Sequence, residues 1–382
     1  FGWNIGDVFG CFIYSTLGVF VGSPIVGFLT DRYGARRTAL ISILFLAAAM
    51  AFLSLMNGSL ALYYGTFFAM GTLGAGTLPV TFTRAINNNF DEMRGLALGI
   101  ALMGTGITGF IVPGLTQMMI DQYGWRTTFQ LLGLLPLLIS FPVAFFWFRD
   151  KKEEALLDEG GKLDATIVPG MPFAAVLKDW RFFAMGLGFL LVGASVSGLI
   201  PNIKFLLQDQ GYTPQMSASK FMGVGLIGFS VLVGRSAGGY LVDKFWAPGI
   251  AFFLLILPVV SCFIFLAGDN PIWLNTLAIC FVGIAAGVEF DLMAFLVAKY
   301  FGMKSYGKIY GALYAMFGLG AGFSPGIFGF VRDTTGSYDV ILMIAAGTVF
   351  VGSLLLLTIG GYRRFDTEGR VVPAPDAAPV AP

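Results

Sequence analysis

The stretch of sequence that decides the fold runs from residue 27 to residue 37 and reads Gly27-Phe28-Leu29-Thr30-Asp31-Arg32-Tyr33-Gly34-Ala35-Arg36-Arg37. A degenerate copy lies 212 positions later, as Gly239-Tyr240-Leu241-Val242-Asp243-Lys244-Phe245. The same offset relates Gly99, Pro113, Gly114, Asp121 and Gly124 to Gly311, Pro325, Gly326, Asp333 and Gly336. A repeat of this length predicts two halves that share one fold.

The composition around these copies is that of a membrane protein. Of 382 residues, 57% are hydrophobic and 12% are charged, and the mean hydropathy is +0.81. A soluble enzyme of this size could not bury so much apolar surface in one core. Histidine is absent, which excludes a Ser-His-Asp triad and histidine metal ligands. A net charge of +1 gives no electrostatic reason to bind nucleic acid. We therefore expect no enzyme activity, no metal and no cofactor.

Long apolar segments divided by short polar turns recur along the whole chain. Each has about the twenty residues that a helix needs to cross roughly 30 Å of hydrocarbon. Only helices and closed barrels satisfy their backbones in lipid, so the sequence predicts an all-α polytopic bundle in the lipid bilayer. We expect eleven spans near 5–29, 38–56, 60–83, 96–120, 127–148, 182–203, 217–242, 248–267, 272–297, 309–331 and 338–361.

The basic residues predict the orientation. With the loop 31–37 in the cytoplasm, eighteen of the 23 basic residues fall on the cytoplasmic side and four on the outer side. This is a strong positive-inside signal, and it places residue 1 outside and the C-terminus in the cytoplasm. The opening Phe1-Gly2-Trp3 resembles the end of an extracellular loop. We therefore expect one more helix to precede this sequence.

A polar segment divides the chain. Residues 149–178 contain Lys151-Lys152-Glu153-Glu154 and a Pro169-Gly170 turn, and they are expected to form a cytoplasmic linker. It would separate an N-terminal bundle of five spans (1–148) from a C-terminal bundle of six (179–361). The end, 362–382, is rich in Pro and Ala and is expected to be a disordered cytoplasmic tail.

These motifs resemble those of the major facilitator superfamily over about residues 1–361. Residues 27–37 are similar to the signature loop after the family's second helix, and Gly124-Trp125-Arg126 and Arg94-Gly95-Leu96-Ala97-Leu98-Gly99 also fit. Within the superfamily the chain is most similar to the bacterial monocarboxylate-porter and oxalate/formate-like branch. The resemblance implies twelve helices, of which eleven are here, in two pseudo-symmetric bundles with a central cavity and alternating access. It also implies a monomer in the bacterial inner membrane that moves a small organic anion, a monocarboxylate, with a proton.

The signature loop is expected to act as a conformational latch. Gly27 lets two helices approach closely, and Asp31 can bind the positive N-terminus of another helix. The resemblance implies that this partner is the helix beginning near 308–309, with Asp243 as the equivalent residue. Arg32, Arg36 and Arg37 would pair across the interface. The alternative is that these are only stop-transfer charges. Arg84, near the cytoplasmic end of its span, is expected to be an interfacial anchor.

Three charged residues lie deep inside predicted spans, away from the span ends, where each costs about 3 kcal/mol if unpaired. They are Arg235, Glu289 and Asp291. The resemblance implies that Arg235 binds the substrate carboxylate; the alternative is a structural salt bridge to Glu289 or Asp291. These two carboxylates lie on different faces of one helix, and one is expected to carry a proton. Relatives often have an Asp one turn before this arginine, where this chain has Val231.

Weaker candidates for substrate contacts are the polar side chains of the same spans. Those expected to form hydrogen bonds with a substrate are Tyr14, Asn202, Tyr310 and Tyr314. The function expected is secondary active transport of a monocarboxylate by proton symport. The alternatives are an organic-anion antiporter or an efflux carrier for amphipathic drugs, which the many phenylalanines would suit.

Overall fold

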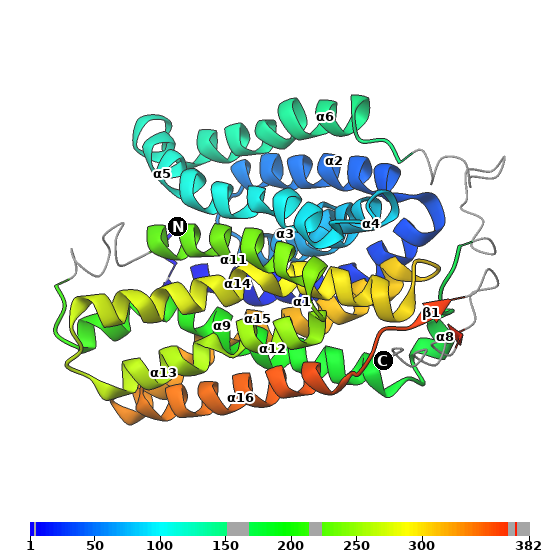
Figure 1. The fold of residues 1–382 in the computed structure, drawn as a ribbon. Helices are drawn as coiled ribbons and strands as arrows, with labels where there is room; N and C mark the ends of the chain where they lie inside the picture. The colour runs from blue at the N-terminus through cyan, green and yellow to red at the C-terminus, as the bar shows by residue number, and fades with distance from the viewer. Residues whose placement is uncertain (4, 151–167, 214–223, 366–370, 373–382) are drawn as a thin grey trace.

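A computed structural model describes residues 1–3, 5–150, 168–213, 224–365 and 371–372, which form a bundle of long helices running side by side (Figure 1). The first part of the chain contains α1 (Ile5–Tyr33), α2 (Ala35–Ser54), α3 (Leu60–Leu73), the 3₁₀ turn η1 (Gly74–Thr77), α4 (Pro79–Asn89), α5 (Arg94–Leu135), the π-helical turn η2 (Pro136–Ser140) and α6 (Phe141–Phe146).

The second part contains α8 (Phe173–Val176), α9 (Trp180–Asp209), α11 (Val224–Lys244), α12 (Ala247–Leu255), α13 (Leu257–Ala267), α14 (Ile272–Phe301), α15 (Tyr306–Thr335) and α16 (Asp339–Thr358). After α16, β1 (Arg364–Phe365) and β2 (Val371–Val372) form an antiparallel pair within the tail that was expected to be disordered. The rest of that tail, 366–370 and 373–382, and linker residues 151–167 lie outside the described residues.

Nine helical segments in the described part of the chain are long and apolar enough to cross a membrane. Two of the eleven expected spans differ. The span expected at 60–83 is divided, because Leu78 is extended and Pro79 begins α4 as a new helix. The span expected at 96–120 is the first part of α5. Helix α5 is two helices that meet at a kink at Gly124, whose φ of 74° is not helical.

Two helix pairs hold the two halves together, and the 212-residue repeat relates one pair to the other. Helix α1 packs along α15, and α11 packs along α5. In the first pair, a Cβ at Gly27 would collide with the carbonyl oxygen of Gly307; in the second, a Cβ at Gly239 would collide with that of Gly95. Glycine is therefore required at these positions, because the two backbones touch.

The densest core surrounds α14, which packs against α9, α11, α12 and α13. Its small and branched residues, among them Val282, Ala285 and Val288, are almost fully buried. Such close packing leaves little room for water, so any charge on α14 must be compensated by neighbouring side chains. Helix α14 carries Glu289 and Asp291.

Candidate functional site

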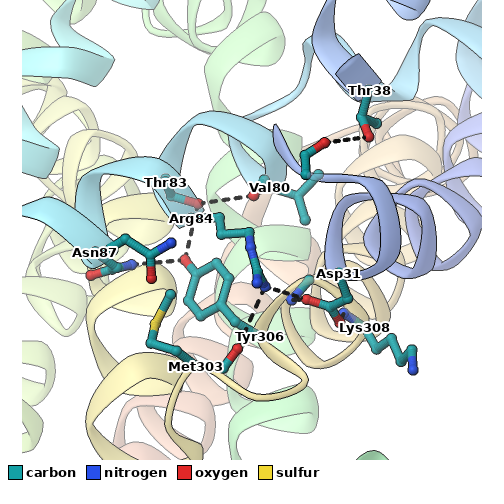
Figure 2. A network of polar contacts seen from close by, with 12 residues as sticks. Asp31, Thr38, Val80, Thr83, Arg84, Asn87, Met303, Tyr306 and Lys308 are labelled. Atoms are coloured by element: carbon teal, nitrogen blue, oxygen red, sulfur yellow. Dashed lines mark hydrogen bonds and ion pairs between the residues drawn. The ribbon is translucent and has the colours of Figure 1, made fainter. Parts of the chain in front are cut away.

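The first polar contact between the halves is centred on Asp31, at the end of α1. Its carboxylate accepts hydrogen bonds from the backbone N–H groups of Gly307 (2.8 Å) and Lys308 (2.9 Å). These amides belong to the first turn of α15, where backbone donors have no partner within the helix and the helix dipole is positive. Figure 2 shows the arrangement. We call the end of the bundle that contains this contact the latch end; the role of the contact as a latch stays a prediction.

Arg84 differs from its expected role as an interfacial anchor. Its side chain points inward from α4 and forms an ion pair with Asp31 (Figure 2). Only 3% of Arg84 is exposed, compared with 7% of Asp31. The Arg84 guanidinium also lies 3.5 Å from the carbonyl oxygen of Met303, in the turn before α15. The position of a residue along a span indicates its depth in the membrane but not the direction of its side chain. The Arg84 side chain faces the neighbouring helices and not the lipid headgroups.

Beside this ion pair lies an uncharged cluster that the sequence analysis missed. The Tyr306 hydroxyl donates to Thr83 Oγ1 (2.9 Å) and accepts from Asn87 Nδ2 (3.0 Å), and Asn87 Nδ2 also lies 3.4 Å from the Ala294 carbonyl oxygen. Thr83, Asn87 and Tyr306 are all buried. Figure 2 shows the cluster joining α4 to α15, and the Ala294 contact extends it to α14. No sequence motif links residues so far apart in the chain.

The second contact repeats the first. Asp243, at the end of α11, accepts hydrogen bonds from the backbone N–H groups of Gly95 (2.7 Å) and Leu96 (2.9 Å), in the first turn of α5. In the register that aligns Gly76 and Phe90 with Gly287 and Phe301, the position equivalent to Arg84 is occupied by Phe295. Lys299, one turn further along α14, is close enough to interact electrostatically with Asp243. The two contacts therefore share their backbone geometry and differ in their cations.

The contacts that the structure describes for Arg36 and Arg32, two basic residues of the signature loop, lie within the first half. Arg36 donates to the carbonyl oxygen of Phe145 in α6 and lies 5.5 Å from the centre of its ring. Arg32 lies over the rings of Phe28 and Tyr33 on its own helix. A basic contact between halves comes instead from Lys308, whose Nζ lies 5.1 Å from the centre of the Phe28 ring. Pairing of Arg32, Arg36 and Arg37 across the interface stays a prediction.

Deeper in the bundle, Arg235 joins three helices. From α11 its guanidinium donates to Asp291 Oδ1 on α14 (2.7 Å) and to Thr105 Oγ1 on α5 (3.1 Å). Arg235 is 2% exposed and Asp291 is 4% exposed. The salt bridge that the sequence left open as an alternative is therefore present. Neither Arg235 Nε nor Asp291 Oδ2 has a hydrogen-bond partner among the described residues, so both groups can still bind.

Glu289 lies on the same helix as Asp291 and is 3% exposed. Its Oε1 has no hydrogen-bond partner among the described residues. The charge of Arg235 acts on Glu289 as well as on Asp291, so one guanidinium serves two buried carboxyl groups. Burying two ionised carboxylates beside a single cation is costly, because one negative charge is left without a counter-ion.

Two of the expected tyrosines lie beside this charged group. Tyr310 is fully buried on α15, with its hydroxyl 3.5 Å from the Phe290 carbonyl oxygen. The ring of Tyr314 stacks on Phe290 at 5.3 Å and on Tyr310 at 6.1 Å. Both tyrosines lie near Arg235. They provide an aromatic wall with polar tips on the α15 side of Arg235.

The other two expected contact residues make structural contacts. Tyr14 is 40% exposed and stacks on Tyr64 at 4.5 Å. Asn202 Nδ2 donates to the carbonyl oxygens of Gly198 and Pro325, and its Oδ1 accepts from the Tyr338 hydroxyl (3.1 Å). Burial raises the pKa of Tyr338, so this hydroxyl stays a neutral donor. A substrate role for Tyr14 or Asn202 stays a prediction.

A cavity of about 700 Å³ lies next to the Arg235 site. Thr105, which accepts a hydrogen bond from Arg235, lines it together with Thr77, Thr108 and Ser140, and the remaining wall is mostly apolar. Its lining comes entirely from α2, η1, α4, α5 and η2. This cavity therefore lies within the first half, and the cavity between the halves stays a prediction.

Comparison with known proteins agrees with this architecture. The profile of the Major Facilitator Superfamily matches residues 1–325. The chain is 27% identical to monocarboxylate transporter 13 of Bos taurus, over 88% of this chain and 76% of that protein, and 27% identical to the nitrite extrusion protein of Bacillus subtilis, over 90% and 82%. Among solved structures it resembles a human organic anion transporter (TM-score 0.69, 18% identity, covering 92% of this chain and 83% of that one).

It also resembles the fucose:proton symporter of E. coli, with a TM-score of 0.66 and 13% identity over 92% of this chain and 98% of that one. These structural likenesses support the fold of two pseudo-symmetric helical bundles. The family profile spans most of the chain, and the relatives are transporters. The protein is an integral membrane transporter, not an enzyme, and it belongs to the Major Facilitator Superfamily.

Proposed function

We propose that this protein carries small organic anions, with monocarboxylates as the substrate class, by alternating access and in symport with protons. The observation that carries the proposal is the buried ion pair between Arg235 and Asp291, with hydrogen-bonding capacity unused on both partners. A guanidinium group can bind a carboxylate through two parallel hydrogen bonds, which makes it well suited to an organic acid.

The pair couples proton binding to anion binding. While Asp291 is ionised it holds Arg235, and removing one partner of a buried pair costs about 3–5 kcal/mol because a charge is left uncompensated. If a proton neutralises Asp291, the guanidinium is released and the substrate carboxylate takes its place. Glu289 is the second buried carboxyl group that can take a proton. The chain contains no histidine, so a carboxyl group must serve as the proton carrier.

Alternating access follows from the two contacts at the latch end. We place this end, and the C-terminus, on the cytoplasmic side of a bacterial inner membrane, because most basic residues fall there. The state described is then closed to the cytoplasm by Asp31 and Asp243. After loading, the halves 1–148 and 179–361 rock apart at this end, and both contacts break. One chain is sufficient for this cycle, so we propose a monomer.

Uptake into proteoliposomes tests the anion site. We expect a proton gradient to drive accumulation of monocarboxylates in the wild-type protein. Arg235→Ala should lose this uptake. Arg332→Ala is a matched control, because its ion pair with Asp209 is exposed and lies on another part of the bundle. Wild-type uptake by Arg235→Ala would show that the carboxylate does not bind there.

The proton role is tested in the same vesicles. We expect acid-stimulated uptake to be lost in Asp291→Asn, Glu289→Gln or both, and stimulation that persists unchanged in both variants excludes the proposed coupling. The relative named as a nitrite extrusion protein favours one alternative, export or exchange of anions. Uptake that depends on an anion preloaded in the vesicle, and not on the pH gradient, would support that alternative.

A further inference from the structure

The end of the linker is joined to the turn that carries the amides bound by Asp31. Residues 169–171 pair with residues 301–303 in the manner of two antiparallel strands. The Met171 N–H donates to the Phe301 carbonyl oxygen (2.8 Å), and the Met303 N–H donates to the Pro169 carbonyl oxygen (2.9 Å). The first bond satisfies a carbonyl group at the C-terminus of α14 that has no partner within the helix.

Both sides of this pairing require glycine. Gly302 has a φ of 75°, and a Cβ there would lie 2.5 Å from the Cα of Gly170. Gly170 has a φ of 141°, and a Cβ there would lie 2.8 Å from the Phe301 carbonyl oxygen and 2.9 Å from the Met303 nitrogen. Real Cβ atoms do not approach other atoms so closely. Any larger residue must therefore push residues 169–171 and the turn apart.

The turn leads directly to the Asp31 contact. Met303 presents its carbonyl oxygen to Arg84, and four residues later Gly307 donates its N–H to Asp31. Residues after α16 also contact the end of the linker. Arg363 donates a hydrogen bond to Met171 Sδ (3.2 Å) and forms an ion pair with Asp179. Residues 169–171 therefore connect the linker to the latch end at a fixed position.

We propose that residues 169–171 act as a strap that positions the turn between α14 and α15, and that Gly170 and Gly302 are positioning residues for the Asp31 contact. This inference rests on the proposed alternating access. The strap makes closure of the latch end depend on the linker, a segment that belongs to neither helical half. Displacing the strap should loosen the amides of Gly307 and Lys308, which bind Asp31 and follow the paired turn in sequence.

The strap is tested by hydrogen exchange of the full chain in lipid nanodiscs. We expect Gly170→Ala, which changes only the linker side, to speed exchange at Gly307 and Lys308 roughly tenfold, because the hydrogen bonds from these two amides to Asp31 are weakened. Gly302→Ala acts from the other side of the pairing and should do the same. Gly336→Ala is the matched control: its φ is 80°, yet its Cβ would meet nothing within 4 Å.

Exchange at Gly307 and Lys308 that is unchanged in Gly170→Ala, relative to Gly336→Ala, overturns the proposal. So does faster exchange in Gly302→Ala alone, because the turn would then act without the linker. In liposomes we expect Gly170→Ala to lower the maximal transport rate and to leave KM unchanged, since the Arg235 site is distant in sequence and unaltered. The exchange measurement does not require a substrate, so failure of the proposed anion symport leaves this test intact.

Discussion

Replacing Arg84 by methionine should shift the protein away from the state closed at the latch end. Arg84 and Asp31 lie in the same half, on α4 and α1, so the ion pair need not break when the halves separate. Its energetic value nevertheless differs between states. In the closed state both side chains are buried, and leaving Asp31 without its cation costs about 3–5 kcal/mol, reduced here because two backbone N–H groups still bind the carboxylate.

In the open state water reaches the same pair, whose value falls to roughly 0–1 kcal/mol. The difference between the two states is therefore about 2–3 kcal/mol against closure, which corresponds to roughly a 30- to 150-fold shift in the equilibrium. We expect Arg84→Met to stay folded, because the methionine side chain fills most of the volume of the arginine stem.

The shift can be measured by labelling a buried reporter. In a background with Cys11, Cys262 and Cys280 replaced by serine, Ala294→Cys places a thiol at a buried position of α14, on the residue whose carbonyl oxygen lies 3.4 Å from Asn87 Nδ2. A membrane-impermeant maleimide added on the cytoplasmic side should label it roughly 30- to 150-fold faster in Arg84→Met. Arg332→Met, which removes an exposed pair at another part of the bundle, should label at the parent rate. Equal rates in Arg84→Met and the parent would refute this reasoning.

Three further outcomes are expected. Tyr306→Phe removes the hydroxyl that is hydrogen-bonded to Thr83 and Asn87, and it should destabilise the closed state by about 1–3 kcal/mol. We expect faster labelling of the Ala294→Cys reporter in this variant. A labelling rate below that of the parent would contradict this. Gly27→Val should abolish transport while the protein still inserts in the membrane, because the valine side chain would separate α1 from α15. Normal uptake by this variant would be incompatible with the backbone contact between these two helices. Asn202→Ala should lower the thermal unfolding temperature and leave the KM for the transported anion unchanged, because the described hydrogen bonds of Asn202 join it to other residues of the bundle. A raised KM with an unchanged unfolding temperature would instead show that Asn202 contacts the substrate.

The sequence predicted those features that a local pattern or the repeat determines. Hydropathy identified the helices, and the 212-residue offset placed Asp31 and Asp243 at equivalent helix ends. The division of the span expected at 60–83 followed from Pro79, whose missing N–H was a readable signal that average hydropathy conceals. The pairing of Arg235 with Asp291, and not with Glu289, depends on how far α11 and α14 rotate about their axes, which no local pattern encodes.

The cluster of Thr83, Asn87 and Tyr306 shows a different limit. Threonine and asparagine on an apolar span are compatible with many roles, because each can bond to its own helix backbone. Only the approach of α4 to α15 makes them partners. The same approach explains why Arg84 is buried and not an interfacial anchor, because its side chain faces the neighbouring helices, which its position along the span does not reveal.

The Asp31 and Asp243 contacts have a consequence for how this protein tolerates genetic variation. Their donors are main-chain N–H groups, at Gly307, Lys308, Gly95 and Leu96. Any amino acid except proline presents the same N–H at the positions of Lys308 and Leu96, so a saturation library should accept many residues there. The acceptor positions have no such freedom, because only a carboxylate offers two oxygens to two adjacent amides. Each contact is thus encoded by its carboxylate and by one glycine, because a Cβ at Gly307 or Gly95 would collide with the facing helix. Variants that drift at Lys308 and Leu96 can keep both contacts unchanged.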